Sequence, residues 1–553
     1  MWDKLGFNFN HDKFKRKAED RLILWNRERF LLRLWGKDHS LWDDSQEHEI
    51  TDRLGWLNVL DQVGKELKEV KDFSQIIEKK EIRHIVLLGM GGSSLAAQML
   101  YKILRGKESF PELYVLSSTH PKSIREIEDN IDPRKTIFIV SSKSGTTLET
   151  LSFFRYFWFL IKKYSSEPGQ HFIAVTDPGS HLDQLAQKRD FLKIFLAPSD
   201  IGGRFSAFTY FGIVPSFLGG ADIENMIIYA QEEMKNNKTP VPEQEADGIA
   251  LGALLGEMAL AGKDKLTFVT DSSLTYFPYW LEQLIAESLG KKGKGIVPVV
   301  DEPQAPIECY GRDRVFINIT FDNDGCNETQ QFVERIAAKG FPVLDFNLEN
   351  KPSLGRELFR WEIAVAAAGS VFRVNPFDQP DVQRSKQFTR NAMEKDGAEK
   401  IKDIRTYSFE NQDNIKQAIR GLLHGAEDNN YISLQTYLQK TSKINQELEE
   451  IRLQLIKKTH LATTLGYGPS FLHSSGQLHK GGKDIGLYIQ LVDDPNFELQ
   501  VPETDYSFLS MIKAQSAGDY QALREKGRQV IRINLGESAE ASVKTLKNII
   551  QDL

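Results

Sequence analysis

Short apolar runs alternate with helical segments through the middle of this chain. The runs lie at 85–88, 113–116, 136–140, 171–175 and 193–196. Runs of this length, rich in β-branched residues, are typical of buried parallel strands, and the helices between them cover both faces of the sheet. The alternation therefore predicts an α/β fold with a parallel sheet between two layers of helices.

The same alternation returns after a polar, Pro-containing linker at 236–243. Further strands are predicted at 265–269, 297–300, 314–321 and 342–346. A chain of 553 residues is too long for a single hydrophobic core, so we expect these strands to form a second α/β unit.

The flanks of these units favour helices. An amphipathic helix is predicted at 18–34, and a helical region from about 403 to 458. The predicted domains are a helical N-terminal segment (1–80), two α/β domains (81–240 and 247–400) and a C-terminal α/β extension (401–553).

A weak internal repeat links the second unit to the C-terminal extension. The segments 314–319 and 339–348 resemble 485–491 and 526–535, with Lys-Gly, Val and Asn-Leu recurring in register. From the residues alone, duplication and chance explain this similarity equally well.

Composition limits the classes of partner. The formal net charge of −7 provides no basic footprint for nucleic acid. The two cysteines, Cys309 and Cys326, form no CxxC motif, in keeping with a reducing cytoplasm. The histidines lack metal-ligand spacing, and no apolar stretch is long enough to span a bilayer. We expect a cytoplasmic protein with no metal, membrane or nucleic-acid partner.

Six hydroxyl-bearing residues, one lysine and a glycine fall within 141–150, directly after the strand at 136–140. Parallel sheets bind ligands at the carboxyl ends of their strands, where helix N-termini also offer N–H groups to anions. Hydroxyls around a single lysine suit a phosphate monoester. We therefore expect this chain to handle a phosphorylated small molecule.

A glycine-rich loop, 89–94, follows the first predicted strand. Its glycines allow the backbone to approach an anion closely. A dinucleotide site is the rival interpretation, but Ser94 replaces the third glycine and no acidic residue ends the next strand. Ordinary turn and helix-cap chemistry is the structural alternative for both loops.

Three other segments carry chemically useful groups. Arg204 follows two glycines, and its planar cation suits an oxyanion. Gln283 and Glu287 are four residues apart, on one face of a predicted helix. His473 and His479 lie in a segment with serines and a glutamine. A surface arginine, a solvated glutamate and a polar loop are the alternative interpretations.

In this order, the motifs resemble the glucose-6-phosphate isomerase (phosphoglucose isomerase) family over roughly 45–400. The likeness is greatest to the isomerase half of bacterial transaldolase/glucose-6-phosphate isomerase fusion proteins, which share the motif at 473–482. The resemblance implies two sugar-isomerase (SIS) domains, each with three αβα layers. It also implies reversible isomerisation of D-glucose 6-phosphate and D-fructose 6-phosphate through a cis-enediolate, in glycolysis and gluconeogenesis, without a cofactor.

The resemblance implies roles for individual residues. Glu287 would move a proton between C1 and C2, and Arg204 would stabilise the enediolate. Lys386 and a histidine would assist ring opening. The expected substrate-binding residues are Gly91, Gly92, Ser93, Ser142, Lys143, Ser144, Thr147, Thr150, Gly203, Gln283 and Gln379.

Two departures from the family pattern matter. Leu289 replaces a polar residue beside the base. An isomerase of broader specificity, which also accepts mannose 6-phosphate, is therefore an alternative interpretation. No histidine lies between Glu287 and Lys386, where the family has its ring-opening histidine. We expect the repeated segment to supply it, with His473 preferred over His479. Because family members take this histidine from a neighbouring subunit, the resemblance implies a homodimer.

An alternative from another functional class is a non-catalytic sugar-phosphate sensor built on the same domains. The presence of Glu287, Arg204 and Lys386 together argues against it, because binding alone requires no base.

Overall fold

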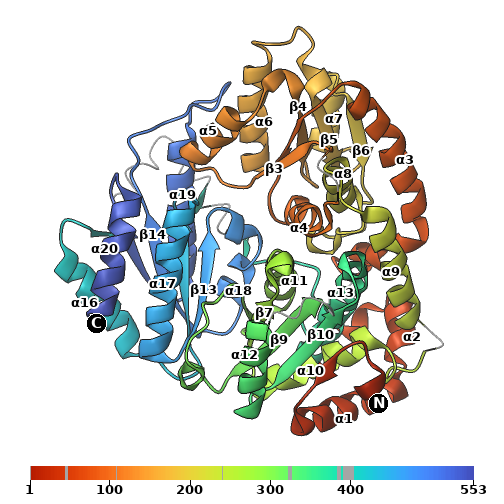
Figure 1. The fold of residues 1–553 in the computed structure, drawn as a ribbon, viewed down its shortest axis with the longest axis vertical. Coiled ribbons are helices and arrows are strands. Elements are labelled where there is room, and N and C mark those ends of the chain that lie inside the picture. The colour runs from red at the N-terminus through yellow and green to blue at the C-terminus, as the bar shows by residue number, and fades with distance from the viewer. Residues whose placement is uncertain are drawn as a thin grey trace.

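The computed structural model describes residues 2–43, 48–106, 109–238, 241–321, 327–382, 388–389 and 404–553. Three five-stranded sheets lie in the three lobes seen in Figure 1. Nearly all strand pairs are parallel, and helices pack around every sheet. The predicted α/β class, with parallel sheets between helices, is confirmed.

The first sheet is all parallel, in the order β3-β2-β4-β5-β6. Its strands are β2 (His84–Leu88), β3 (Glu112–Leu116), β4 (Thr136–Ser141), β5 (Phe172–Thr176) and β6 (Lys193–Leu196). The helices of this region are α3 (Val59–Lys79), α4 (Leu95–Leu104), α5 (Pro121–Asn130), α6 (Leu148–Ile161), α7 (His181–Lys188), α8 (Tyr210–Leu218) and α9 (Ile223–Asn236). Along β4, Ile137 and Ile139 enter one core while Phe138 and Val140 enter another. Burial on both faces explains the uninterrupted apolar run.

The second sheet has the order β1-β10-β9-β7-β8. Its strands are β1 (Asn8–Phe9), β7 (Lys265–Thr270), β8 (Val297–Val299), β9 (Arg314–Phe321) and β10 (Val343–Leu348). The helices of this region are α10 (Asp247–Leu260), α11 (Phe277–Leu289), α12 (Asn327–Ala338) and α13 (Leu354–Phe372). β1 pairs antiparallel with β10, so the N-terminal segment, predicted to be helical, also adds a strand to this sheet.

The third sheet is all parallel, in the order β11-β15-β14-β12-β13. Its strands are β11 (Tyr407–Ser408), β12 (Tyr431–Tyr437), β13 (Ala462–Tyr467), β14 (Gly486–Val492) and β15 (Gln529–Asn534). The helices of this region are α16 (Gln412–His424), α17 (Ser442–Thr459), α18 (Gly476–Gly481), α19 (Phe508–Glu525) and α20 (Ala539–Gln551). The helical region predicted from 403 to 458 is partly wrong, because β12 lies within it. Apolar Ile432 and Leu434 alternate with polar Ser433 and Gln435 along this strand, a strand signal that the sequence reading overlooked. The four predicted domain boundaries stay predictions.

The N-terminal helix predicted at 18–34 is wrong as a single element. It is two helices, α1 (Asp12–Glu28) and α2 (Phe30–Trp35), separated by Arg29 in the left-handed conformation with φ of 54°. The break lets Trp25 and Phe30 stack with their ring centroids 4.3 Å apart, and both side chains are buried. Aromatic packing therefore outweighs helical continuity here.

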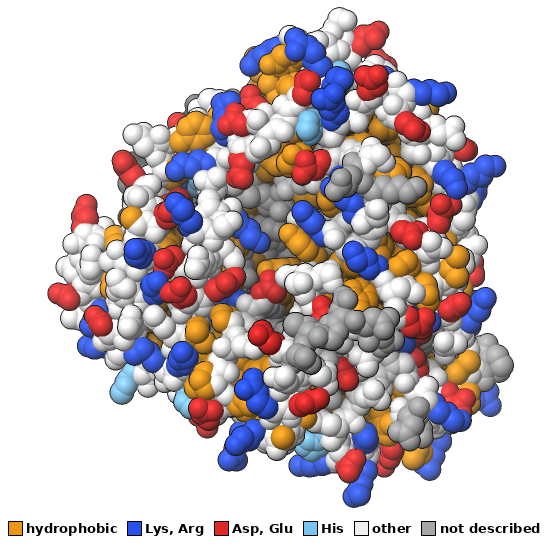
Figure 2. Space-filling view, viewed as in Figure 1, with side chains coloured by type: hydrophobic (Ala, Val, Ile, Leu, Met, Phe, Trp, Pro, Cys, Tyr) orange, Lys and Arg blue, Asp and Glu red, His pale blue; other side chains and the backbone are white. Residues whose placement is uncertain are grey.

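Acidic and basic side chains are interspersed across the face shown in Figure 2. Within the described ranges, no helix combines the length and the apolar character needed to cross a membrane. The part of the chain that the structure describes also holds no group of three or more His, Cys, Asp or Glu side chains placed to bind a metal ion.

Candidate active site

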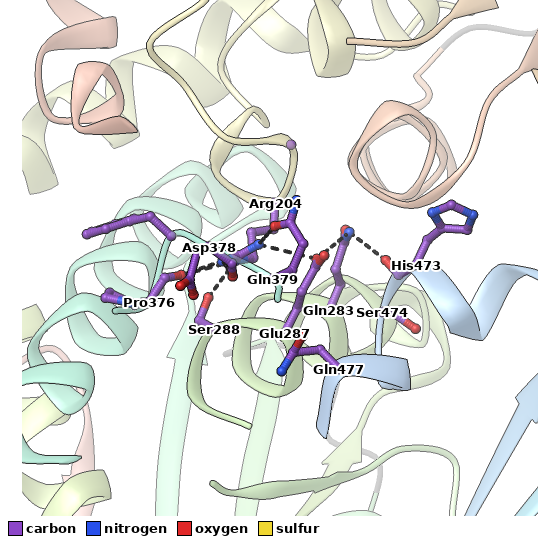
Figure 3. Close-up of polar contacts among 12 residues, drawn as sticks. Arg204, Gln283, Glu287, Ser288, Pro376, Asp378, Gln379, His473, Ser474 and Gln477 are labelled. Carbon is purple, nitrogen blue, oxygen red and sulfur yellow. Dashed lines mark hydrogen bonds and ion pairs between the residues drawn. The ribbon is translucent and has the colours of Figure 1, made fainter. Parts of the chain in front are cut away.

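A cavity of about 540 Å³ opens at the carboxyl ends of β2 and β4. All three lobes contribute to its wall, through the loops after these strands, the segment around 203–204, α11, and a turn of the third lobe at 472–473. Figure 3 shows the polar contacts where several of these segments meet. The predicted site residues on the wall are Gly91, Gly92, Ser93, Lys143, Ser144, Thr147, Gly203, Arg204, Gln283, Glu287, Gln379 and His473.

Two predicted residues do not line the cavity, and a third is not described. Ser142 and Thr150 are buried and do not line the cavity. Ser142 shapes the loop from behind, because its Oγ lies 3.0 Å from Thr147 Oγ1 and accepts from the N–H of Gly145 at 3.2 Å. Lys386 lies outside the described residues.

The hydroxyl-rich loop forms a cup because of its turn. Gly145 has φ of +69°, in the region that favours glycine. The side chains of Lys143, Ser144 and Thr147 line the cavity, and Lys143 Nζ lies 2.6 Å from Asp177 Oδ2. α6 begins directly after Thr147, so its first N–H groups lie beside the cup. Hydroxyls, one ammonium group and a helix N-terminus together suit an anion such as a phosphate.

Glycines let three loops meet at the cavity. Gly91 has φ of +53°, and a Cβ at this position would lie 2.8 Å from the carbonyl oxygen of His473. A Cβ on Gly92 would lie 2.2 Å from the carbonyl oxygen of Gly203. A larger residue at either position would therefore push the first sheet's loop away from its neighbours.

Arg204 is fixed by the segment that follows α13. Its guanidinium donates to the carbonyl oxygens of Pro376 and Asp378 at 2.6 and 2.8 Å (Figure 3). Nη1 donates to Gln379 Oε1 at 2.8 Å and lies 3.6 Å from Glu287 Oε2. Burial lowers the pKa of Arg204, and the carboxylate of Glu287 opposes this shift. The site thus holds a buried, preoriented cation.

Helix α11 presents Gln283 and Glu287 to the cavity from the same face. Gln283 Nε2 donates to Glu287 Oε2 at 3.1 Å and to the carbonyl oxygen of His473 at 2.8 Å (Figure 3). Glu287 is 7% exposed. The carboxylate is therefore nearly dry, is held between an amide and Arg204, and is available to a proton on a ligand in the cavity.

His473 reaches the cavity from the third lobe. Its Nε2 lies 3.4 Å from Glu149 Oε1, and Gln515 Nε2 donates to the same oxygen at 2.7 Å. Sequence reasoning missed both Glu149 and Gln515, although both line the cavity. Glu149 had a signal, because it is the one carboxylate in the 141–150 segment. Gln515 lies in a helix far along the chain and had none.

Two residues on which the alternative interpretations depended, His479 and Leu289, do not line the cavity. His479 is buried, its Nδ1 lies 3.1 Å from Gln435 Nε2, and burial holds its pKa well below the usual value. Leu289 is fully buried in the largest hydrophobic core. Neither lines the cavity, so the geometry favours His473 over His479 and puts Leu289 out of reach of a ligand there.

A buried lysine supports this arrangement from behind. Lys291 Nζ lies 2.7 Å from Asp378 Oδ1 and donates to the carbonyl oxygen of Asn375 at 2.5 Å. Burial, together with the nearby charge of Arg204, lowers the pKa of Lys291 to about 7. Lys291 therefore fastens to α11 the segment that positions Arg204.

Comparisons with known proteins place this chain in a family. The family model described as phosphoglucose isomerase matches residues 50–312. A glucose-6-phosphate isomerase of Staphylococcus aureus is 31% identical over 410 residues, which cover 64% of this chain and 89% of the relative. The chain belongs to the phosphoglucose isomerase family. A probable glucose-6-phosphate isomerase of Methanococcus maripaludis is 26% identical over 386 residues, or 63% of this chain and 86% of that relative.

Solved structures share the phosphoglucose isomerase fold. The crystal structure of a glucose-6-phosphate isomerase from Chlamydia trachomatis has a TM-score of 0.58 and 18% identity, covering 72% of this chain and 91% of that one. A hypothetical protein from Thermus thermophilus has a TM-score of 0.61 and 23% identity, covering 70% and 100%. The phosphoglucose isomerase match at 50–312 includes Arg204 and Glu287 and ends before Gln379 and the third sheet.

Proposed function

We propose that this member of the phosphoglucose isomerase family interconverts D-glucose 6-phosphate and D-fructose 6-phosphate. The observation that carries the proposal is the pairing of Glu287 with Arg204, 3.6 Å apart, in a cavity that also contains a hydroxyl-lined cup. An aldose–ketose isomerase needs a base for a carbon-bound proton and a cation for the enediolate charge. Both groups lie in this cavity.

The substrate phosphate would bind in the cup formed by Lys143, Ser144 and Thr147, beside the N-terminus of α6. The phosphate takes no part in the bond changes. Its binding instead holds C1 and C2 of the sugar near Glu287, so that binding energy is used for positioning.

Proton transfer follows from the positions of two groups. Glu287 removes the proton from C2 of the open-chain aldose and returns it to C1, and the reverse reaction uses the same path. The intermediate is a cis-enediolate, whose negative charge develops close to Arg204. Because backbone carbonyl oxygens already orient Arg204, little reorganisation is needed as that charge forms.

Ring opening requires a proton on the ring oxygen and loss of one from the C1 hydroxyl. We assign this exchange to His473, which lines the cavity. Glu149 is its positioning residue, because its carboxylate lies beside the imidazole and is itself held by Gln515. Lys386 stays the predicted second proton-transfer group.

The alternatives have less support. Broader specificity for mannose 6-phosphate rested on Leu289, which lies in the core. A non-catalytic sensor would bind phosphate without needing a base beside a buried cation. The cytoplasmic location and the homodimer stay predictions. The reason given for the homodimer was a histidine from a second chain, whereas here His473 reaches the cavity from within the same chain.

The test is turnover of fructose 6-phosphate by the purified protein and two variants. We expect the wild type to form glucose 6-phosphate, and we expect Glu287→Gln and His473→Ala to lower kcat by about 10²- to 10⁴-fold. Matched controls are Glu308→Gln and His424→Ala, whose side chains are exposed and outside the cavity. Both controls should keep wild-type rates.

The outcomes separate the candidate functions. A wild type that binds fructose 6-phosphate but does not convert it would favour the sensor. An active protein in which His473→Ala equals the wild type would remove His473 from the mechanism and leave the isomerase assignment intact. An active Glu287→Gln variant would refute the assignment of the base.

A further inference from the structure

The second and third sheets are built to the same plan. Their strand orders, β1-β10-β9-β7-β8 and β11-β15-β14-β12-β13, correspond position by position. The four strands after the edge strand are parallel in both sheets, whereas the edge strand β1 is antiparallel and the edge strand β11 is parallel. In each unit a helix precedes the first parallel strand of the repeat and another follows it: α10 and α11 around β7, α16 and α17 around β12. The weakly repeated segments of the sequence fall on β9 with β10 and on β14 with β15, the same places in the two sheets. This agreement favours duplication over chance.

The two copies contribute different parts of the cavity. In the second unit, α11 supplies Gln283 and Glu287, while its counterpart α17 supplies no residue to the wall. In the third unit, the segment after β13 supplies Leu472 and His473. The corresponding segment after β8, residues 300–312, is fully described and supplies none. The second unit thus provides the carboxylate of Glu287 to the cavity, and the third unit provides the imidazole of His473.

Direct contacts join these two halves within one molecule. Gln283 of α11 bonds to the backbone of His473, and Ser474 Oγ donates to Glu282 Oε1 at 3.0 Å. On the other side of the turn, Gln477 Nε2 donates to the carbonyl oxygen of Gly290 at 3.0 Å. Figure 3 shows α11 and the turn bearing His473 side by side. Helix α11 is therefore bound to the histidine turn at three successive points.

Close packing reinforces these bonds. A Cβ on Gly290 would lie 2.4 Å from the Cα of Leu478, so the end of α11 and helix α18 are in backbone contact. Leu478 and Ala286 also share one small buried apolar cluster. The end of α11 and helix α18 are thus in direct contact where the two copies meet.

We propose that one chain contains one complete site, assembled in cis from the two copies, so that Glu287 and His473 of each site belong to the same molecule. The proposal rests on the isomerase function proposed above. It states that the third lobe takes the place that a second polypeptide would otherwise fill, and that activity needs no exchange of groups between chains.

The test mixes two disabled variants. Glu287→Gln and His473→Ala are co-expressed in equal amounts with the same affinity tag and purified together without selecting mixed dimers, and turnover of fructose 6-phosphate is measured. A cis site predicts only the summed residual activities of the two variants. A site shared across a dimer predicts rescue to about a quarter of the wild-type rate, because half of randomly paired dimers are mixed and each holds one intact site. Such rescue would overturn the proposal.

The double variant Glu287→Gln/His473→Ala is the matched control. Co-expressed with wild type in equal amounts, so that chains pair at random, it leaves about half of the activity if sites are in cis. If sites are shared, each mixed dimer loses both sites, and about a quarter remains. Circular dichroism of each variant checks folding, and the specific activity of the wild type across dilution gives a second measurement. Constant activity supports a cis site, and loss on dilution contradicts it. An inactive wild type refutes the proposed function rather than the cis arrangement.

Discussion

The first and third sheets are both five-stranded and all parallel, yet they are used in opposite ways. Beyond β2 and β4 of the first sheet, glycines and hydroxyl side chains face a cavity of about 540 Å³. On the third sheet, the face under α18 and α19 is filled by buried charges. Lys480 Nζ lies 2.6 Å from Asp519 Oδ1, with side-chain exposures of 2% and 0%.

The filled face is a connected polar network. Gln490 on β14 hydrogen-bonds to Arg532 on the neighbouring strand, and Arg532 Nη2 donates to Ser516 Oγ at 3.0 Å. Asp519 on α19 joins this network through Gln490. The comparison teaches that the shared architecture does not make a binding site. Small residues leave space for a ligand at one sheet, while paired charges make a rigid scaffold of the other.

The largest expected effect comes from breaking the buried pair. Lys480→Met would leave the Asp519 carboxylate buried without its cation, which costs about 3 to 5 kcal/mol in the free energy of unfolding. Urea denaturation would measure this loss. Turnover per folded molecule should stay near the wild-type value, because Lys480 does not line the active-site cavity.

An exposed ion pair provides the control for this variant. Lys443 Nζ lies 3.0 Å from Glu540 Oε1 in the same lobe, but the side chains are 77% and 53% exposed. Lys443→Met should therefore change stability by less than about 1 kcal/mol. Equal losses from the two lysine variants would show that burial of the pair does not set its contribution.

A smaller effect is expected from filling space at the open sheet. Gly92→Ala would place a Cβ 2.2 Å from the carbonyl oxygen of Gly203, so the two loops must separate. A shift of about 1 Å between cavity loops can lower kcat/KM by about 10²-fold. Steady-state kinetics with fructose 6-phosphate would measure the change.

Gly202→Ala is the matched control, because a Cβ on Gly202 would meet nothing within 4 Å. Its φ of −68° is also open to any residue. This variant should keep kcat/KM within about twofold of the wild type. If Gly92→Ala behaved the same way, the close approach of the loops would not matter for catalysis.

Local patterns were sufficient for much of the first two sheets. The strand β9 was predicted with its observed ends, because an apolar run is a property of neighbouring residues. The 141–150 segment, predicted to bind a ligand, contributes Lys143, Ser144 and Thr147 to the cavity wall. The spacing of Gln283 and Glu287 likewise predicted a shared helix face. These features depend on short stretches of chain.

Other features depend on partners far away in sequence and could not be predicted locally. Strand β12 carries a local alternation of Ile432 and Leu434 with Ser433 and Gln435, but its polar residues are also buried, because the third lobe covers both faces of the strand. Gln515 reaches the cavity only because the third lobe packs on the first. Thr150 was expected to contact the ligand through its hydroxyl. It lies in the first turn of α6, and its side chain is buried in the protein rather than on the cavity wall.

The smallest predicted effect concerns the region where the first and third sheets meet. A second cavity of about 360 Å³ lies between β3, α11 and α17. Glu282 lines it and accepts from Ser474 Oγ. Burial raises the pKa of Glu282 from 4.5 to about 7. Between about pH 4.5 and pH 7, Glu282 is therefore protonated in the folded protein and ionised in the unfolded chain.

Folded-state stabilisation from this proton is therefore lost as pH rises from about 4.5 to 7. Glu282→Gln removes that dependence, so the variant and the wild type should be similarly stable at about pH 5. At about pH 8 the variant should be more stable by about 1 to 2 kcal/mol, since partial exposure to the cavity reduces the full effect. Urea denaturation at both pH values measures this difference, and Glu308→Gln controls for the lost charge. A constant difference between Glu282→Gln and wild type at the two pH values would mean that Glu282 is already ionised in the folded protein at pH 5.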